Sequence, residues 1–565
     1  MTGPRITGGI QELQTESLIA SFPAEVLTSI FIEVKATDEI EHWDGKQLEW
    51  IKITHVCRYW RAVGIRARCL WTNIPMYSKG WALEMLKRSK DMSIVATVDF
   101  TGSSSVRNYP SYKALGGLLE NFSRIQELNL IKAYHMEATP FLDLTLPAGQ
   151  VPRLHTLRFG GQMYFDDYSD ILCFRDSTFF QYLDLSSLRR LSLTDCHLNW
   201  TESSQLLRNL THIRVISDHQ NNLLDKGVEP FFDVLRNVPH LESLDFEYFV
   251  GPSELPEIHP LPAHFQRVAL PNLKILRLGV QMCQLELILQ GLDIPSDAFI
   301  KLYCYELSTS FDRFSPVLSA YASHLARTGK HIRTFELSNY TPAEFKIAIW
   351  PTVLLLETLH AIDTPPIMET IFCWDHEDAY HPPEMIYSHV LNVLKLEHLE
   401  SLKLHDYNVV KANTWKTTFG TLPKLASIDL CTTNSRGLWT VLESHVDNND
   451  TESKGDNKSL PFSSLRDVAI SFKNITCPTG MRVYQGVIYH AVKLRSTIGA
   501  GLKRLIIFDA PVLSGEVINQ IREIVPVIEK SRTSDKDSYS ILKVNAGRCG
   551  LNDLDDTDDL MGVWR

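Results

Sequence analysis

Apolar residues return along most of the chain in one six-residue pattern, apolar-x-x-apolar-x-apolar. The last two apolar positions are two residues apart, so they lie on the same face of a β-strand. The pattern recurs roughly every 30 residues, which predicts repeated strand units lying side by side. The complete copies are Ile125-Leu128-Leu130, Leu154-Leu157-Phe159, Leu188-Leu191-Leu193, Leu210-Ile213-Val215, Leu241-Leu244-Phe246, Leu273-Leu276-Leu278, Ile332-Phe335-Leu337, Leu399-Leu402-Leu404, Leu425-Ile428-Leu430, Leu465-Val468-Ile470 and Leu502-Leu505-Ile507.

The segments between the copies have helical rather than strand spacing, and a strand that cannot bury its apolar face alone must lie beside the next one. The long gap after Leu273 is predicted to hold one more strand over residues 299–304, and Leu356-Leu359 is a partial copy. We therefore predict an α/β protein in which residues 75–545 form an irregular leucine-rich-repeat-like solenoid. Unrelated alternating strands in a sandwich are the alternative.

Residues 18–74 follow a helical pattern instead. The polar stretch 37–46 is predicted to be a loop, and two further short helices are predicted over residues 48–55 and 56–70. A three-helix unit of this size buries little surface alone, so it needs a partner or the repeat body. The first helix begins after Phe22 and Pro23, and its broad apolar face is formed by Val26, Leu27, Ile30, Phe31 and Val34.

Three segments of this helical module carry a family resemblance: Phe-Pro-Ala-Glu-Val-Leu-Thr-Ser-Ile-Phe at 22–31, His-Val-Cys-Arg-Tyr-Trp-Arg at 55–61, and Leu70-Trp71. Together they resemble the F-box of the large fungal (basidiomycete-type) family of F-box proteins with degenerate leucine-rich repeats. Members of that family usually begin Leu-Pro-x-Glu, so Phe22 replaces a leucine here, and the loop between the first two helices is longer.

The resemblance implies a substrate-recognition subunit of an SCF-type (Skp-cullin-F-box) ubiquitin ligase. In that role the F-box docks on a Skp-type linker bound to a cullin, the repeats bind a substrate protein, and the chain itself performs no chemistry. Docking by an apolar helix face in a groove makes Phe22, Pro23, Val26 and Ile30 the candidate contacts with the linker. The predicted F-box core consists of Leu27, Phe31, Val56, Trp60 and Trp71.

Two alternatives to this interpretation stay open. The apolar residues of the module can instead pack it onto the first repeats. The chain can also be a leucine-rich-repeat protein-binding scaffold with no link to ubiquitin, its N-terminal helices serving as a cap of the solenoid.

Composition and charge narrow the classes of partner. The net charge of -11 and the pI near 6.0 give no electrostatic reason to expect nucleic acid or an anionic membrane as a partner. The start of the chain has no basic segment followed by an apolar run, and no stretch approaches the ~20 apolar residues of a membrane span. Ten cysteines without a C-x-x-C pair predict reduced thiols in the cytoplasm or nucleus.

The sequence predicts neither an enzyme nor a cofactor. It contains no G-x-S-x-G, G-x-x-x-x-G-K-[ST], G-x-G-x-x-G or H-E-x-x-H motif. One cluster resembles a metal site, comprising Cys373, Asp375, His376 and His381. It lacks a complete ligand set at the usual spacing, so a solvated loop without metal is the preferred interpretation.

In each copy, the two residues beside the middle apolar position are predicted to point onto the exposed face of the sheet. Three of these residues form a possible substrate patch. Arg158, Arg190 and Arg214 come from three consecutive copies. Neighbouring strands are about 4.8 Å apart, so the three guanidinium groups can converge on one carboxylate or phosphate. In the alternative, Glu127 and Asp245 on either side neutralise the ends of the row.

Three segments are expected to contribute nothing to the core. Residues 1–17 are predicted to be a flexible N-terminus, and residues 447–459 are predicted to be a disordered insertion between repeats because they contain no apolar residue. Residues 546–565 form an acidic tail with five aspartates between positions 553 and 559.

Overall fold

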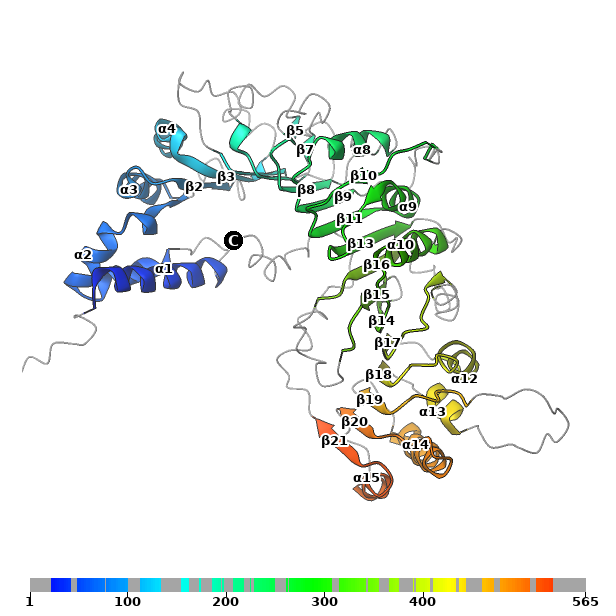
Figure 1. The fold of residues 1–565 in the computed structure, drawn as a ribbon. Coiled ribbons are helices and arrows are strands. Elements are labelled where there is room, and N and C mark those ends of the chain that lie inside the picture. Colours follow the sequence, from blue (N-terminus) through cyan, green and yellow to red (C-terminus); the bar gives the residue numbers. More distant parts are fainter. Residues whose placement is uncertain are drawn as a thin grey trace, which may run out of the picture. The chain divides into compact units, whose positions relative to one another are not determined.

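The computed structural model is a mixed α/β protein with a large, mostly parallel β-sheet (Figure 1). It divides into two units, Met1–Cys196 with Asp555–Arg565 and His197–Leu554, and each is considered by itself. The structure describes residues 22–41, 48–76, 78–99, 112–133, 154–161, 172–173, 185–194, 196–197, 207–217, 224, 228–248, 261–262, 264–306, 314–341, 344–354, 365–374, 390, 393–406, 410–432, 436–443, 460–471, 478–508 and 515–531.

The first unit begins with helices and continues into a parallel sheet in the order β1-β2-β3-β4-β6. The helices at its start are α1 (Ala24–Glu41), the 3-10 helix η2 (Glu49–His55), α2 (Arg58–Arg66) and the 3-10 helix η3 (Arg68–Trp71). The elements that follow are β1 (Asn73–Pro75), α3 (Lys79–Ser89), β2 (Ile94–Asp99), α4 (Tyr112–Glu120), η4 (Phe122–Arg124), β3 (Ile125–Ala133), β4 (Thr156–Gly161), β5 (Leu172–Cys173), η7 (Leu185–Ser187), β6 (Arg190–Thr194) and β7 (Cys196–His197).

Two details of the helical module differ from the prediction. The polar stretch from residue 37, predicted to be a loop, continues α1 as far as Glu41, because no glycine or proline interrupts the helix-forming residues there. The third predicted helix is divided, since α2 ends at Arg66 and a separate 3-10 turn, η3, begins at Arg68.

The second unit has its sheet in the order β8-β9-β11-β13-β16-β15-β14-β17-β18-β19-β20-β21. Its strands are β8 (His212–Ser217), β9 (Ser243–Tyr248), β10 (Val268–Ala269), β11 (Ile275–Gln281), β12 (Leu292–Asp293), β13 (Phe299–Glu306), β14 (Thr334–Thr341), β15 (Glu344–Trp350), β16 (Met368–Trp374), β17 (Ser401–Asp406), β18 (Ser427–Thr432), β19 (Asp467–Ser471), β20 (Arg504–Phe508) and β21 (Val527–Ser531). Its helices are α8 (Glu229–Arg236), α9 (Met282–Gly291), α10 (Phe314–Thr328), α12 (Ala412–Thr414), the π-helical turn η10 (Trp415–Phe419), α13 (Arg436–Glu443), α14 (Pro478–Thr497) and α15 (Gly515–Arg522).

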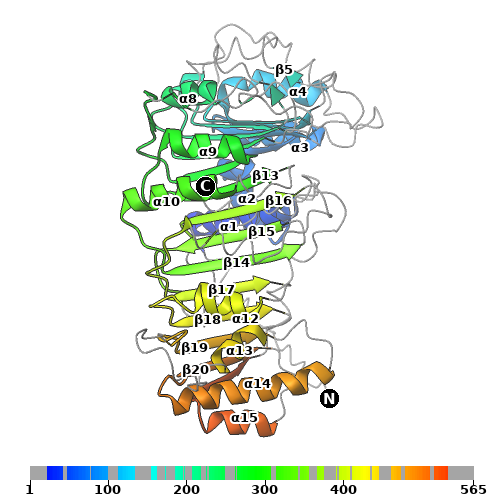
Figure 2. The same cartoon turned by 90° about the vertical axis from the view of Figure 1, so that its right-hand side faces the viewer.

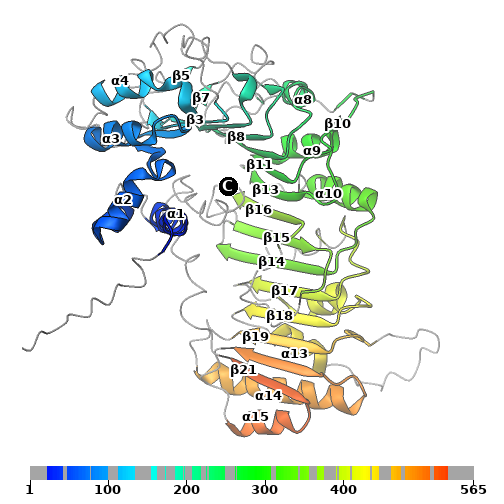
Figure 3. The same ribbon diagram turned by 60° about the vertical axis from the view of Figure 1, so that its left-hand side comes forward.

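Each complete copy of the six-residue pattern forms a strand, and so does the predicted segment 299–304. Corresponding apolar positions lie opposite one another, as in the row Leu244–Leu276–Ile300, and these side chains are almost fully buried. Helices α9, α10, α13 and α14 follow one face of the second unit's sheet (Figures 1 and 3). The partial copy at Leu356-Leu359 lies outside the described residues.

One part of the second unit departs from a simple succession of strands. Strands β14, β15 and β16 form an antiparallel meander, and β16 rather than β14 lies beside β13 (Figure 2). Only two residues separate β14 from β15, and such a short connection requires antiparallel pairing. The buried residues of β15 are Phe345 and the apolar run from Ile347 to Trp350.

Candidate interaction surfaces

Helix α1 has two apolar faces with opposite environments. Leu27 and Phe31 are fully buried, and the Phe31 ring lies 5.2 Å from the Trp60 ring. Phe22 and the α1 residues at every fourth position after it, Val26, Ile30 and Val34, are between 38% and 44% exposed. We call these four residues the apolar stripe; Pro23 beside Phe22 is exposed as well.

The core of the module is built around Trp71. Its Nε1 donates to the Gly64 carbonyl at 2.9 Å, and its ring lies 5.1 Å from the ring of Trp50. At Gly64 a Cβ atom would lie 3.0 Å from the Thr54 methyl group, so α2 and η2 approach closely there. Trp50 is a core residue that the sequence analysis did not single out, although its size and its place in a predicted helix were signals for it.

Val56 was predicted to belong to this core, and the prediction is wrong because its side chain is 60% exposed. Helix α2 begins only at Arg58, and the Sγ atom of Cys57 caps it by accepting from the Trp60 N–H at 3.4 Å. Val56 therefore precedes the helix and turns outward. The Tyr59 hydroxyl donates to the Phe22 carbonyl at 2.8 Å, which fixes the start of the apolar stripe against α2.

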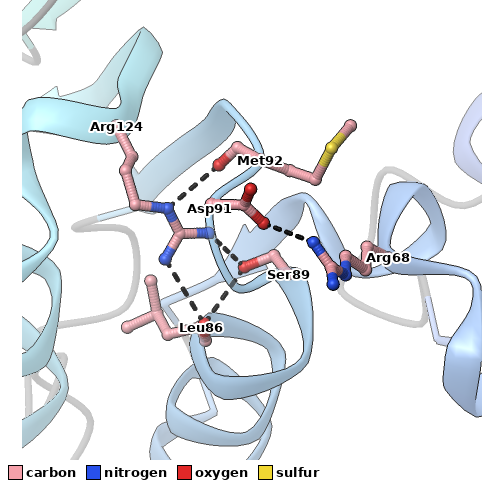
Figure 4. A network of polar contacts seen from close by, with 6 residues as sticks. All are labelled: Arg68, Leu86, Ser89, Asp91, Met92 and Arg124. Carbon is pink, nitrogen blue, oxygen red and sulfur yellow. Dashed lines mark hydrogen bonds and ion pairs between the residues drawn. The ribbon is translucent and has the colours of Figure 1, made fainter.

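The module is attached to the following elements through a different surface (Figure 4). Arg68 of η3 pairs with Asp91 at 2.6 Å, just after α3, and Arg88 of α3 stacks over the Trp71 ring at 4.2 Å. Arg124 holds the same turn by donating to the Met92 carbonyl at 3.0 Å and to the Ser89 hydroxyl at 2.6 Å. The described contacts between the module and α3 thus leave the apolar stripe exposed.

The three arginines of the predicted substrate patch are not gathered into one site by the described contacts. Arg158 and Arg190 belong to neighbouring strands of the first unit, β4 and β6. They are not directly opposite each other, because Arg190 is paired with Thr156 and Arg158 is paired with Ser192. Arg214 belongs to the second unit. Arg158 lies 3.8 Å from Glu127, and Arg214 lies 3.4 Å from Asp245. These pairs support the alternative in which acidic neighbours neutralise the ends of the row.

A longer row of charges runs across the face of the second unit's sheet that is opposite to its leucine core. Five strands contribute residues in register, Arg214, Asp245, Arg277, Lys301 and Glu369. Three further strands contribute Glu336, Lys403 and Asp429 in register, and Lys346 of β15 joins the two groups. We call these nine residues the charged ladder.

Ion pairs connect several neighbouring members of the charged ladder. Arg277 reaches the same Asp245 carboxylate as Arg214, at 3.7 Å. Glu369 lies 3.1 Å from Lys301 and 3.4 Å from Lys346. Lys346 and Glu369 lie on strands that have no copy of the six-residue pattern. Neither residue was therefore predicted to lie on a binding surface. For Lys346 the signal was the alternation of polar and apolar residues from Glu344 to Ile347.

Burial and neighbouring cations act in opposite directions on two carboxylates of the ladder, Asp245 and Glu336. Burial raises the pKa of Asp245, and two neighbouring arginines oppose that rise. Burial would also raise the pKa of Glu336, but the net shift is downward, because Lys346 and other cations stabilise the carboxylate and the Ser338 hydroxyl donates to it at 2.9 Å.

The metal-like cluster of the sequence, for which a solvated loop is the preferred interpretation, lies mostly outside the described residues. Cys373 lies on β16, and Asp375, His376 and His381 lie outside the described residues. In the described part of the chain, no group of three or more His, Cys, Asp or Glu side chains is placed to hold a metal ion. Among the described helices, none has the length and apolar character of a membrane span.

Comparison of the chain with protein-family models and with curated proteins finds no match. The described residues thus offer two surfaces for a partner, the apolar stripe of α1 and the charged ladder of the second unit.

Proposed function

We propose that the chain is the substrate-recognition subunit of an SCF-type ubiquitin ligase. In this proposal the N-terminal helices act as an F-box that docks on a Skp-type linker, and the leucine-rich-repeat-like body binds the substrate protein. The observation that carries the proposal is the apolar stripe, which is exposed on the helix whose residues resemble the F-box motif.

The energetics of the stripe favour a partner. Fully covering a large aliphatic or aromatic side chain contributes about 1.5–3 kcal/mol, and each of the four stripe residues still exposes 38–44% of its surface. Covering the remainder can therefore supply about 2–5 kcal/mol to a helix-in-groove complex. The other face of α1 is already used, since Leu27 and Phe31 are fully buried. Packing within the module and binding of the linker thus draw on different residues of one helix.

The experiment replaces two stripe residues by aspartate. Val26→Asp with Ile30→Asp is expected to abolish binding to a purified Skp-type linker, because carboxylates buried in an apolar interface cost several kcal/mol. Ile32→Asp is the matched control, since Ile32 is 42% exposed on the same helix but lies outside the stripe. Co-precipitation and calorimetry measure binding, and circular dichroism checks that the variants fold.

Unchanged binding of the double variant, or an equal loss in Ile32→Asp, would contradict the docking assignment. A wild-type chain that binds no Skp-type linker but still captures other proteins would favour the scaffold without a ubiquitin link.

A further inference from the structure

The charged ladder is nearly balanced in formal charge, but its cations and carboxylates are not equally exposed. In the pair Arg214–Asp245 the side chains are 31% and 12% exposed, and in the pair Lys301–Glu369 they are 25% and 15% exposed. Lys346 is 22% exposed, more than either carboxylate that it contacts. The cation is also the more exposed partner between Arg277 and Asp245. A partner approaching this face therefore meets N–H donors first.

The lengths of the side chains explain this layering. Lysine and arginine carry their charge at the end of a long stem, whereas aspartate places its carboxylate close to the backbone. Glu247, one of the remaining acidic residues on this face, is buried for another reason: it leans across Gly279, where a Cβ atom would lie 2.7 Å from its Cγ. The carboxylates thus lie beneath the cations.

The two arginines of the ladder also share one counterion. Arg214 and Arg277 approach the Asp245 carboxylate at 3.4 and 3.7 Å, which is longer than a direct charged hydrogen bond. Each guanidinium carries five N–H donors, so a second anion can be accepted while the pairs with Asp245 persist.

We propose that Arg214, Arg277, Lys301 and Lys346 form a docking surface for an acidic segment of a partner protein, bound through its carboxylate or phosphate groups. The inference rests on the proposed function, in which this partner is the substrate to be ubiquitinated. It is carried by the greater exposure of these cations than of the carboxylates beneath them, on a chain whose net charge is -11.

The test uses the full chain and fluorescently labelled peptides, with binding measured by fluorescence anisotropy at several salt concentrations. One peptide is rich in Glu and Asp, a second replaces these residues by Gln and Asn, and a third carries phosphoserines. Binding of the acidic peptides, weakened by salt, and absence of binding by the neutral peptide are expected. Preference for the phosphoserine peptide would assign phosphate as the anion, and equal binding would assign carboxylate.

Variants then locate the site. Arg214→Gln with Lys301→Gln is expected to weaken binding of the acidic peptide about three- to tenfold, as for partly exposed ion pairs. Lys274→Gln is the matched control, because Lys274 pairs with Glu242 at 2.6 Å outside the ladder and is 71% exposed. This control is expected to bind like the wild type.

Asp245→Asn distinguishes a binding surface from a purely structural ladder. Removing this carboxylate leaves both arginines without their shared counterion, so affinity for the acidic peptide is expected to rise about twofold or more. Thermal unfolding checks that the variant is folded.

A fall or no change in the affinity of Asp245→Asn, or equal binding of the neutral peptide, would overturn the proposal. Tighter binding of a single-stranded nucleic acid of equal charge would also overturn it. Binding to the Skp-type linker is measured in parallel, so that loss of the linker interaction alone counts against the proposed function and not against the acidic-segment site.

Discussion

The apolar stripe and the charged ladder both depart from the usual distribution, in which apolar side chains are buried and charged side chains are exposed. On α1 of the first unit, Val26 and Ile30 are 44% and 38% exposed. On the sheet of the second unit, Glu336 and Lys403 are only 8% and 7% exposed. Exposed apolar side chains are stabilised only when a partner covers them, whereas the buried charges are stabilised by neighbouring strands of the same chain.

Because of this difference, changes in the two surfaces should affect different properties of the protein, binding in one case and folding in the other. A change in the apolar stripe should affect binding with little effect on folding. A change in the deep carboxylates of the charged ladder should affect folding, because it leaves partly buried cations without their counterions.

The largest effect is expected on the buried face of α1. Leu27→Ala should lower the stability of the helical module by about 3 kcal/mol, because it leaves a cavity between α1 and the other helices. Val26→Ala, one residue away on the apolar stripe, should change stability by less than about 0.5 kcal/mol. Hydrogen exchange of the α1 amides measures both effects, and equal loss of protection would show that the two faces are not distinct.

A smaller effect is expected for the most deeply buried part of the ladder. Glu336→Gln should lower the free energy of unfolding by about 2 kcal/mol at pH 7, because Lys346 and Lys403 lose a carboxylate. The pKa of Glu336 is lowered in the folded state, so its contribution is present above the unfolded pKa and is lost as the pH falls through the folded value.

The measurement for Glu336→Gln is urea unfolding of the wild type and the variant at several pH values. The difference between them should shrink as the solution becomes acidic. A constant difference would mean that the charge of Glu336 contributes nothing to the stability of the ladder.

The smallest effect is expected for a segment that belongs to neither surface. Deletion of residues 447–459 should change stability by less than about 1 kcal/mol, since the entropy of loop closure grows slowly with length. The chain after this segment is held independently, because buried Arg495 donates to the Phe462 carbonyl at 2.8 Å. A large fall in melting temperature would show that the segment packs against the body.

Most strands could be predicted from the six-residue pattern, and the strands that were not predicted lack this pattern. Strands such as β11 and β18 follow directly from their apolar spacing, since alternate side chains face opposite sides. Strands β2, β15, β16 and β21 contain no copy of the six-residue pattern, so the pattern did not predict them. Val56 was misplaced because its side-chain direction depends on where Cys57 begins the cap of α2, a boundary that periodicity alone defines poorly.

The sequence by itself determined which residues form most of the strands, because the side on which a strand residue lies depends on a periodicity within a few residues. Only the tertiary structure decided which charges meet. Lys301 and Glu369 are far apart in the chain, and they pair because the β14–β15–β16 meander places β16 beside β13. Pairing between distant strands depends on the path of the intervening chain, and no local pattern encodes that path.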